Sequence, residues 1–171
     1  MIAVRGADPD DAPSIPPLTI AAWQRAYVGI FTPRLLAALA EPERIEERVT
    51  LTRQRLEEPP PGMAEFVAEL DGNVVGWLRA VATTDAEIEA CYVHPDAWGR
   101  GVGRALLAAG VQTLIERGCR EQLLWTLELN DRSRRFYEGQ RWVHDGAVRL
   151  REFTVGELGE TANEVRYVHS V

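Results

Sequence analysis

The chain has 171 residues, of which 46% are hydrophobic and 26% are charged, and its formal net charge is −7. This composition is typical of a single compact domain with a sizeable core, which we place at residues 1–171, and it excludes disordered and fibrous proteins. The acidic balance argues against a nucleic-acid partner, because binding a phosphate backbone requires a basic face, and it favours a neutral or cationic partner.

The sequence also gives expectations about compartment and metals. No stretch approaches the roughly 18 consecutive apolar residues that a membrane span requires, so no membrane association is expected. Residues 1–11 carry acids rather than a basic and then apolar secretory signal, and we therefore expect a cytoplasmic protein. Cys91 and Cys119 lack metal-ligand and redox spacing, so we expect two reduced thiols and no metal.

The N-terminal third is predicted to be mainly helical. Residues 2–5 alternate like a short strand and are followed by turn-forming residues. Trp23, Ala26, Tyr27 and Ile30 recur at helical spacing, which predicts a first helix with one aromatic and apolar face. Two further helices are expected at residues 34–40 and at about 45–56.

The period changes to that of strands in the middle of the chain. Residues 66–70 and 74–81 flank an Asp-Gly-Asn turn, which predicts a β-hairpin. A third strand at about 87–93 is stopped by His94-Pro95. The elements expected after it are a helix with Leu107, Val111, Leu114 and Ile115 on one face, a strand at 122–129, a helix at 131–138, and strands near 142–153 and 163–169. A strand meander followed by helical crossovers predicts a mixed sheet with helices on both faces.

A glycine-rich turn joins the strand ending at Val93 to the helix that follows it. Successive backbone N–H groups at a helix N-terminus, together with the helix dipole, can hold a phosphate. The spacing of Gly99, Gly101 and Gly103 fails the G-x-G-x-x-G dinucleotide pattern, and the chain contains no G-x-x-x-x-G-K-[ST] run. Three glycines are entropically costly in a plain connection, so the sequence predicts a phosphate-binding loop.

Two runs of residues resemble the signatures of one enzyme family. Tyr92-Val-His-Pro95 followed by Trp98-Gly-Arg-Gly-Val-Gly-Arg-Ala-Leu-Leu107 resembles the acetyl-CoA-binding motif of the GNAT superfamily of N-acetyltransferases. Asn130 followed by Arg135-Phe-Tyr-Glu138 resembles its second signature. The order of elements is similar from about residue 2 to residue 169. The resemblance implies an α/β (α+β) fold with a mixed, mostly antiparallel central sheet of about six to seven strands flanked by helices on both faces, and acetyl-CoA as co-substrate.

The resemblance also implies roles for individual residues. The Tyr92-Val93 backbone would pair with the pantetheine arm, with the Val93 amide polarising the thioester carbonyl. Asn130 would bond the pantetheine chain, and Tyr137 would protonate the departing thiolate. The cofactor-binding set implied in this way is Tyr92, Val93, Trp98, Gly99, Arg100, Gly101, Val102, Gly103, Arg104, Asn130, Ser133 and Tyr137.

The chain departs from the family pattern at two places. Trp98 stands where the family favours Gln or Arg, so an aromatic ring replaces a side-chain phosphate contact, and Arg100 and Arg104 are expected to compensate. Arg141-Trp142 stands where the family favours Gly-Phe, which affects the local turn and leaves the cofactor site in place.

Acetyl transfer to an amine requires a neutral nucleophile and a protonated leaving group. The period of a strand predicts that Glu87, Glu89 and Cys91 share one face and that Ile88 and Ala90 share the other. Glu87 stands where some family members have a glutamate base and Glu89 lies one pleat closer to the thioester, so either carboxylate or a water chain could be the base. Cys91 is interpreted as a small, half-buried hydrophobic residue rather than an acetyl carrier.

The acceptor is less well defined than the donor. Trp23, Tyr27 and Phe31 are expected to pack the first helix on the sheet, and some of them are expected to line the acceptor pocket. The primary hypothesis is direct transfer of acetyl from acetyl-CoA to a primary amine of an unidentified small molecule or protein. A catalytically silent acyl-CoA-binding or sensor module, a preference for longer acyl chains, and a homodimer all stay open.

Overall fold

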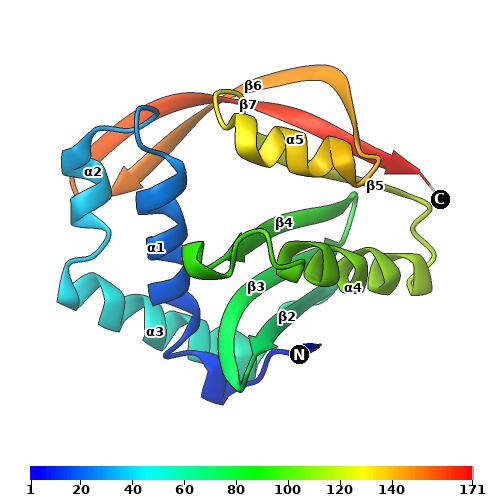
Figure 1. Ribbon diagram of the computed structural model, residues 1–171, viewed down its shortest axis with the longest axis horizontal. Helices are drawn as coiled ribbons and strands as arrows, with labels where there is room; N and C mark the ends of the chain where they lie inside the picture. Colours follow the sequence, from blue (N-terminus) through cyan, green and yellow to red (C-terminus); the bar gives the residue numbers. More distant parts are fainter. Residues whose placement is uncertain (171) are drawn as a thin grey trace.

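The computed structural model describes residues 1–170 and contains one seven-stranded sheet in the order β1-β2-β3-β4-β5-β7-β6 (Figure 1). Neighbouring strands are antiparallel except β4 and β5, which are parallel, so the predicted mixed and mostly antiparallel sheet is confirmed. The strands are β1 (Ile2–Gly6), β2 (Met63–Leu70), β3 (Asn73–Ala82), β4 (Ala86–Val93), β5 (Glu121–Leu127), β6 (Val143–Val155) and β7 (Leu158–Ser170). The helices are α1 (Ile15–Ala26), α2 (Pro33–Ala38), α3 (Pro42–Glu57), α4 (Val102–Glu116) and α5 (Asp131–Gly139), with 3-10 turns η1 (Pro9–Asp11) and η2 (Pro95–Ala97).

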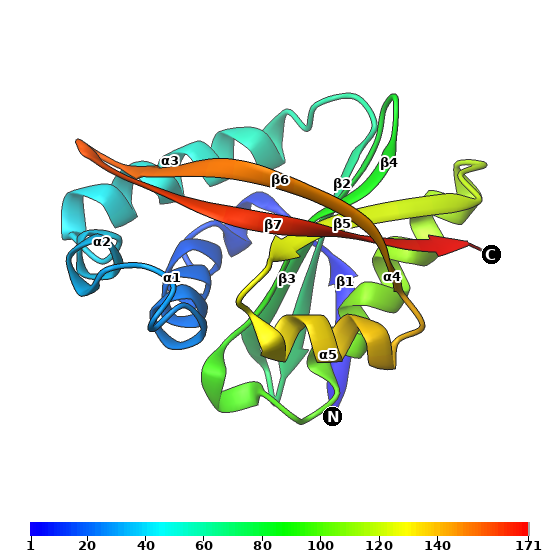
Figure 2. The same ribbon diagram turned by 90° about the horizontal axis from the view of Figure 1, so that it is seen from above.

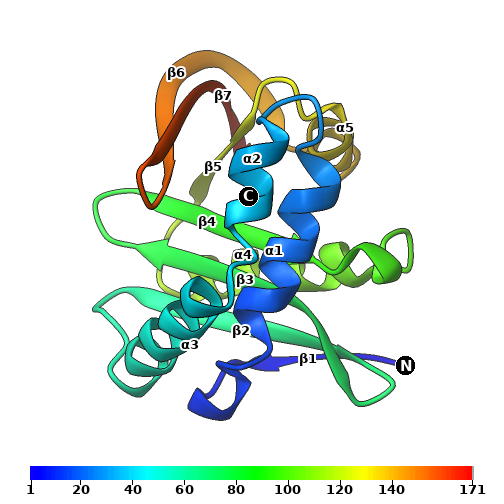
Figure 3. The same cartoon turned by 90° about the vertical axis from the view of Figure 1, so that its left-hand side faces the viewer.

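Helices cover both faces of the sheet. The larger core lies between the sheet and helices α4 and α5, and its fully buried members include Leu78, Leu106 and Tyr167. On the opposite face, α1 lies across β3 and β4 (Figure 3) and buries Leu18 against Trp77. The long β6–β7 hairpin reaches across to the N-terminal helices (Figure 2), where α2 packs on its tip.

The sheet opens between its two parallel strands. Strands β4 and β5 share a single pair of partners, Glu87 and Leu123. The chain crosses from β4 to β5 through α4, which returns it in the same direction. Beyond Glu87 the two strands are no longer paired, and residues 87–93 of β4 and 125–127 of β5 line a common cavity. The backbone therefore leaves a cleft in the middle of the sheet.

Two predicted element ends differ from the structure. The first helix ends at Ala26, with Tyr27 as its C-cap, so the prediction that Ile30 continues its face is wrong. Gly29 has a φ of 83°, a left-handed value that glycine tolerates and that stops a helix. Strand β5 ends at Leu127 rather than at residue 129, because the chain turns there and Asn130 caps α5.

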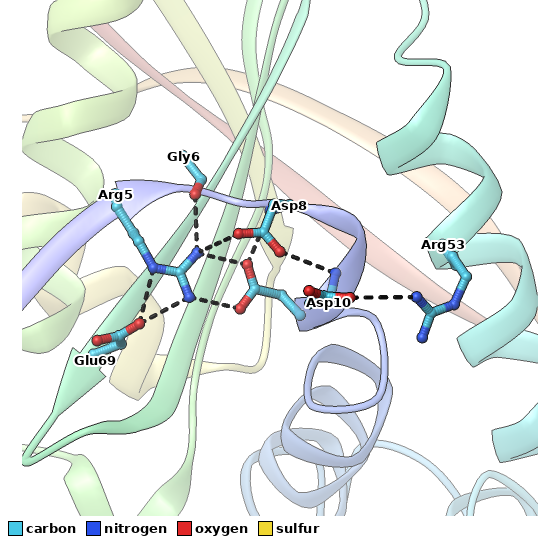
Figure 4. A network of polar contacts seen from close by, with 7 residues as sticks. Arg5, Gly6, Asp8, Asp10, Arg53 and Glu69 are labelled. Carbon is cyan, nitrogen blue, oxygen red and sulfur yellow. Dashed lines mark hydrogen bonds and ion pairs between the residues drawn. The ribbon is translucent and has the colours of Figure 1, made fainter.

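The N-terminal strand is fixed by a charged network around Arg5 (Figure 4). Arg5 donates from NH1 and NH2 to the two carboxylate oxygens of Asp11 at 2.7 and 2.8 Å, and from Nε to Glu69 at 2.8 Å. Asp11 is 5% exposed. Burial acts to raise the pKa of Asp11, but the bonds from Arg5 and from the Asp8 amide outweigh it, and the pKa lies below its usual value. The network ties β1 and η1 to β2.

Replacing Asp11 with asparagine is expected to lower the free energy of unfolding near neutral pH by about 2 kcal/mol, because Arg5 loses a charged partner. The folded pKa is depressed, so this stabilisation is present above the unfolded pKa of a carboxyl group and disappears as the pH falls through the folded pKa. Urea unfolding of both proteins at neutral and acidic pH would measure the difference. Asp10→Asn is the control, because its carboxylate lies 3.9 Å from Arg53 and is fully exposed. Equal losses in the two variants would contradict the role of Asp11.

Candidate active site

The cavity between β4 and β5 has a volume of about 810 Å³. It extends from the glycine turn before α4, past the open edge of β4, to the side chains of α1 and β6. Of the predicted site residues, all those named for the cofactor, both glutamates, Trp23 and Tyr27 line it. Phe31 does not: it is 3% exposed and packs beside Trp23, with ring centroids 5.9 Å apart. The structure therefore brings nearly the whole predicted set to one cavity.

The glycine turn places unpaired backbone donors at one end of this cavity. Gly99 and Gly101 have φ values of 77° and 87°, which favour glycine, and Gly101 is the N-cap of α4 without any side-chain cap. The first N–H groups of a helix have no intrahelical partner, so those of α4 are available to an anion. A Cβ atom at Gly103 would lie 3.3 Å from Cζ of Phe136, which makes this position tight for any larger residue. The turn fits a phosphate group.

Trp98 has a structural role in the turn. Its Nε1 donates to the carbonyl of Val93 at 2.7 Å and so fixes the end of β4 against the turn. The guanidinium of Arg132 lies 3.9 Å from the centre of the Trp98 ring and also lines the cavity. Arg132 was missed in the sequence, although one signal was present: it stands in the first turn of α5, where the helix dipole disfavours a cation. A stacked arginine thus stands beside the ring of Trp98.

Asn130 and Ser133 form the cap of α5. The Asn130 amide oxygen accepts from the Ser133 N–H at 3.2 Å, and its nitrogen donates to the Ser133 hydroxyl at 2.7 Å. One N–H of the amide has no partner among residues 1–170. The cap orients α5 so that Tyr137, nearly two turns after Asn130, lines the cavity.

Tyr137 is 8% exposed and packs against Phe136, Trp142 and Tyr167. Burial raises its pKa well above the ordinary value, and the neighbouring Cys91 adds to the shift. The phenol is therefore protonated at neutral pH. A buried, protonated hydroxyl beside β4 can act as a proton donor.

A β-bulge changes the faces of β4. Glu89 is the extra residue, since Arg79 pairs with Ala90 while the next residue of β3 pairs with Ile88. Ile88 and Cys91 consequently both pack in the core on the α4 side, whereas Ala90 packs on the α1 side. The prediction that Cys91 shares a face with the glutamates, opposite Ile88, is wrong because simple alternation does not survive the bulge.

The two glutamates have different surroundings. The Glu89 carboxylate lies 3.5 Å from NH1 of Arg79 and its side chain is 39% exposed. Glu87 is half-buried and forms no hydrogen bond or ion pair within residues 1–170. Burial raises the pKa of Glu87, with Arg149 opposing the shift. Burial also raises the pKa of the Cys91 thiol to about 12, so this thiol stays protonated and unreactive, as its interpretation as a hydrophobic residue expects.

The far end of the cavity contains residues that the sequence did not single out. Glu164 is 5% exposed and accepts from Nε of Arg149 at 2.6 Å and from NH1 of Arg151 at 3.2 Å. The Arg149 guanidinium lies 4.2 Å from the centre of the Trp125 ring. Arg149 and Arg151 alternate on β6, which was the available signal, but nothing local shows that the β6–β7 hairpin borders this cavity. The acceptor end therefore carries cations as well as aromatic rings.

Two negative findings apply to the part of the chain that the structure covers. No helix within residues 1–170 is long and apolar enough to cross a membrane. Over the same residues, no group of three or more His, Cys, Asp and Glu side chains is arranged to hold a metal ion.

Comparison with known proteins identifies related sequences. The model of the acetyltransferase (GNAT) family matches residues 23–140. A probable N-acetyltransferase of Mycobacterium tuberculosis is 28% identical over 150 residues, covering 85% of this chain and 82% of that protein. A mycothiol acetyltransferase of Thermobispora bispora is 34% identical over 107 residues, covering 54% of this chain and only 36% of that relative.

Solved structures share the fold. The PaiA N-acetyltransferase of Thermoplasma acidophilum, solved in complex with coenzyme A, superposes with a TM-score of 0.75 at 15% identity, covering 100% of this chain and 99% of that one. The ribosomal-protein-S18-alanine N-acetyltransferase of Escherichia coli gives a TM-score of 0.69 at 17% identity, covering 100% and 94%. At these identities the likeness supports the architecture alone.

Proposed function

Because the chain belongs to the GNAT family of acetyltransferases, we propose that it transfers an acetyl group from acetyl-CoA directly to a primary amine. The observation that carries the proposal is one cavity that joins the uncapped glycine turn to Tyr137 and Glu87. A phosphate site, a proton donor and a proton acceptor on the same cavity are what direct acyl transfer requires.

The donor end holds the cofactor through backbone and cations. The amides of the turn at 98–104 bind the pyrophosphate of CoA, with Arg100, Arg104 and Arg132 around it. The open edge of β4 at Tyr92 and Val93 pairs with the pantetheine arm, and the Val93 amide faces the thioester carbonyl. When bound, acetyl-CoA supplies an activated acyl group with a thiolate as leaving group.

The two proton transfers fall to separate residues. Glu87 accepts a proton from the acceptor ammonium, directly or through water, and leaves a neutral amine. The amine nitrogen forms a bond to the acetyl carbon, and the carbon–sulfur bond breaks. Tyr137 donates its phenolic proton to the sulfur and regains a proton, through water, from the nitrogen as it becomes an amide, so the products are an N-acetylated amine and the free thiol of CoA. Cys91 takes no part, because its thiol stays protonated.

Titration calorimetry tests the cofactor site. The wild-type protein is expected to bind acetyl-CoA, and Gly103→Val is expected to bind it about tenfold or more weakly, because a side chain there displaces Phe136 and the turn. Gly139→Val is the matched control, since a Cβ at this position of α5 meets no atom within 4 Å. The proposal fails if the wild type does not bind acetyl-CoA.

Release of free CoA thiol across a panel of amines separates an enzyme from a silent sensor. The proposed enzyme releases thiol in an amine-dependent way, with N-acetylated product detected by mass spectrometry. Tight binding with no amine-dependent release from any amine would instead favour an acyl-CoA-binding module.

A further inference from the structure

Cations gather at the acceptor end of a protein whose net charge is −7. Arg48 of α3 is half-buried and forms no ion pair within residues 1–170. It lines a second cavity of about 210 Å³. Trp23, Arg151 and Phe153 form a wall that this small cavity shares with the large one. Arg48 therefore stands just beyond the place where the acceptor would lie.

Arg48 has no ion-pair partner among the nearby carboxylates within residues 1–170. Glu164 already binds both Arg149 and Arg151. Glu47, the neighbour of Arg48 in α3, is exposed and makes no ion pair with Arg48. Burial lowers the pKa of Arg48, yet a guanidinium in a protein stays protonated. Arg48 thus lines the small cavity without an ion-pair partner, although Glu152 lines the same cavity, while Arg149 and Arg151 share Glu164. Removing charged groups from water without partners is costly, so this arrangement suits an anionic ligand.

Hydrogen-bond donors without acceptors point to the same place. Nε1 of Trp23 is buried and has no partner within residues 1–170. Burial raises the pKa of Tyr92, whereas Trp23 and Tyr27, which lie within hydrogen-bonding reach of the Tyr92 hydroxyl, and the charge of Arg151 act to lower it. Buried polar groups in folded proteins are almost always paired, so an indole N–H that makes no well-aligned hydrogen bond beside a cavity is available to an acceptor atom of a ligand.

We propose that the acceptor amine carries an anionic group, and that this group binds between Arg48, Arg151 and Nε1 of Trp23 while the amine points to Glu87. The inference rests on the proposed acetyl transfer and specifies its substrate class as a small zwitterionic amine. Carboxylates and phosphonates share the required chemistry, since both offer charged oxygens to guanidinium groups. This subsite, formed by Arg48, Arg151 and Trp23, selects acceptors that carry a negative charge at the end remote from the reacting amine.

Matched acceptors test the substrate class. The panel contains α- and ω-amino acids, the corresponding amides and decarboxylated amines, and aminoalkylphosphonates of equal length. We expect kcat/KM for the anionic members to exceed that of their amides by about tenfold or more, with the two anionic arms distinguishing carboxylate from phosphonate. Equal or better use of the amides and simple amines overturns this inference and leaves the proposed function intact. Acetyl-CoA binding without turnover of any anionic member also overturns it, whereas failure to bind acetyl-CoA overturns the proposed function.

Variants of the subsite supply a second readout. Arg48→Gln is expected to raise KM for the preferred anionic acceptor by about tenfold or more and to bring the acid-to-amide ratio of kcat/KM towards one. Trp23→Phe keeps the ring and removes the N–H, and it is expected to act in the same direction. Arg53→Gln on the same helix is the control, because its side chain is 40% exposed and faces Asp10. Unaltered acid-to-amide ratios in Arg48→Gln and Trp23→Phe, with folding verified by circular dichroism, would refute the subsite.

Discussion

Replacing Tyr137 with phenylalanine is expected to lower kcat by about 10²–10³-fold while acetyl-CoA affinity stays within about twofold. The substitution removes the only group of the ring that can donate a proton and keeps the packing on Phe136, Trp142 and Tyr167. Burial already holds this phenol in its protonated form, so its loss leaves the thiolate to be protonated by water.

Steady-state kinetics with saturating acetyl-CoA, together with calorimetry, would separate the two effects. Tyr167→Phe is the matched control: its hydroxyl donates to Glu138 at 2.7 Å and accepts from Arg134, away from the cavity lining. We expect this control to lose about 1 kcal/mol of stability and little turnover. Parallel losses of affinity and turnover in Tyr137→Phe would mean that the tyrosine is structural.

Replacing Glu87 with glutamine is expected to lower kcat/KM by about 10²-fold near neutral pH, because the acceptor ammonium then loses its proton acceptor. Glutamine nearly preserves the size of the side chain and cannot take up the proton. The half-buried position of Glu87, without a partner within residues 1–170, is what leaves its carboxylate available.

The pH profile carries the stronger signature of this role. Burial raises the pKa of Glu87, and a base works only when deprotonated, so wild-type kcat/KM should increase as the pH rises through this raised value. In Glu87→Gln the increase in kcat/KM at the pKa of Glu87 should be absent, and kcat/KM should rise only as the free amine loses its proton. Glu89→Gln is the control from the same strand, since Arg79 already neutralises Glu89. A larger effect in Glu89→Gln than in Glu87→Gln would transfer the proposed role to Glu89.

The cofactor end could be predicted from the sequence because it is local. The end of β4 at Val93, the turn and the start of α4 follow one another directly in the sequence. Gly99 and Gly101 have the positive φ values that favour glycine, so the residue types themselves indicate the turn. Similarly, the cap formed by Asn130 and Ser133 lies within four residues. The structure places all of these residues on one cavity.

The acceptor end could not be predicted because it is assembled from distant segments. Arg48 and Arg151 lie on α3 and β6, and they line one cavity only after the β6–β7 hairpin has been placed beside β5. Which side chains of β4 share a face could not be predicted either, because nothing in the sequence of residues 86–93 indicates that Glu89 is the bulged residue. A bulge is decided by pairing with β3, which is information from another part of the chain.

The single pair that joins β4 to β5 acts geometrically as a pivot. The pivot divides the sheet into two arms, one formed by β1 to β4 with α4 and the other by β5, β7, β6 and α5. Glu87 lies at the pivot, whereas Tyr137 and Arg151 belong to the second arm. The separation between the proton acceptor and the proton donor is consequently governed by an angle between two half-sheets rather than by any loop. Packing between the arms sets that angle, because one buried cluster joins Leu78 and Leu106 of the β1–β4 half to Leu124 and Tyr167 of the other half. Core residues that do not line the cavity thereby determine the distance between Glu87 and Tyr137.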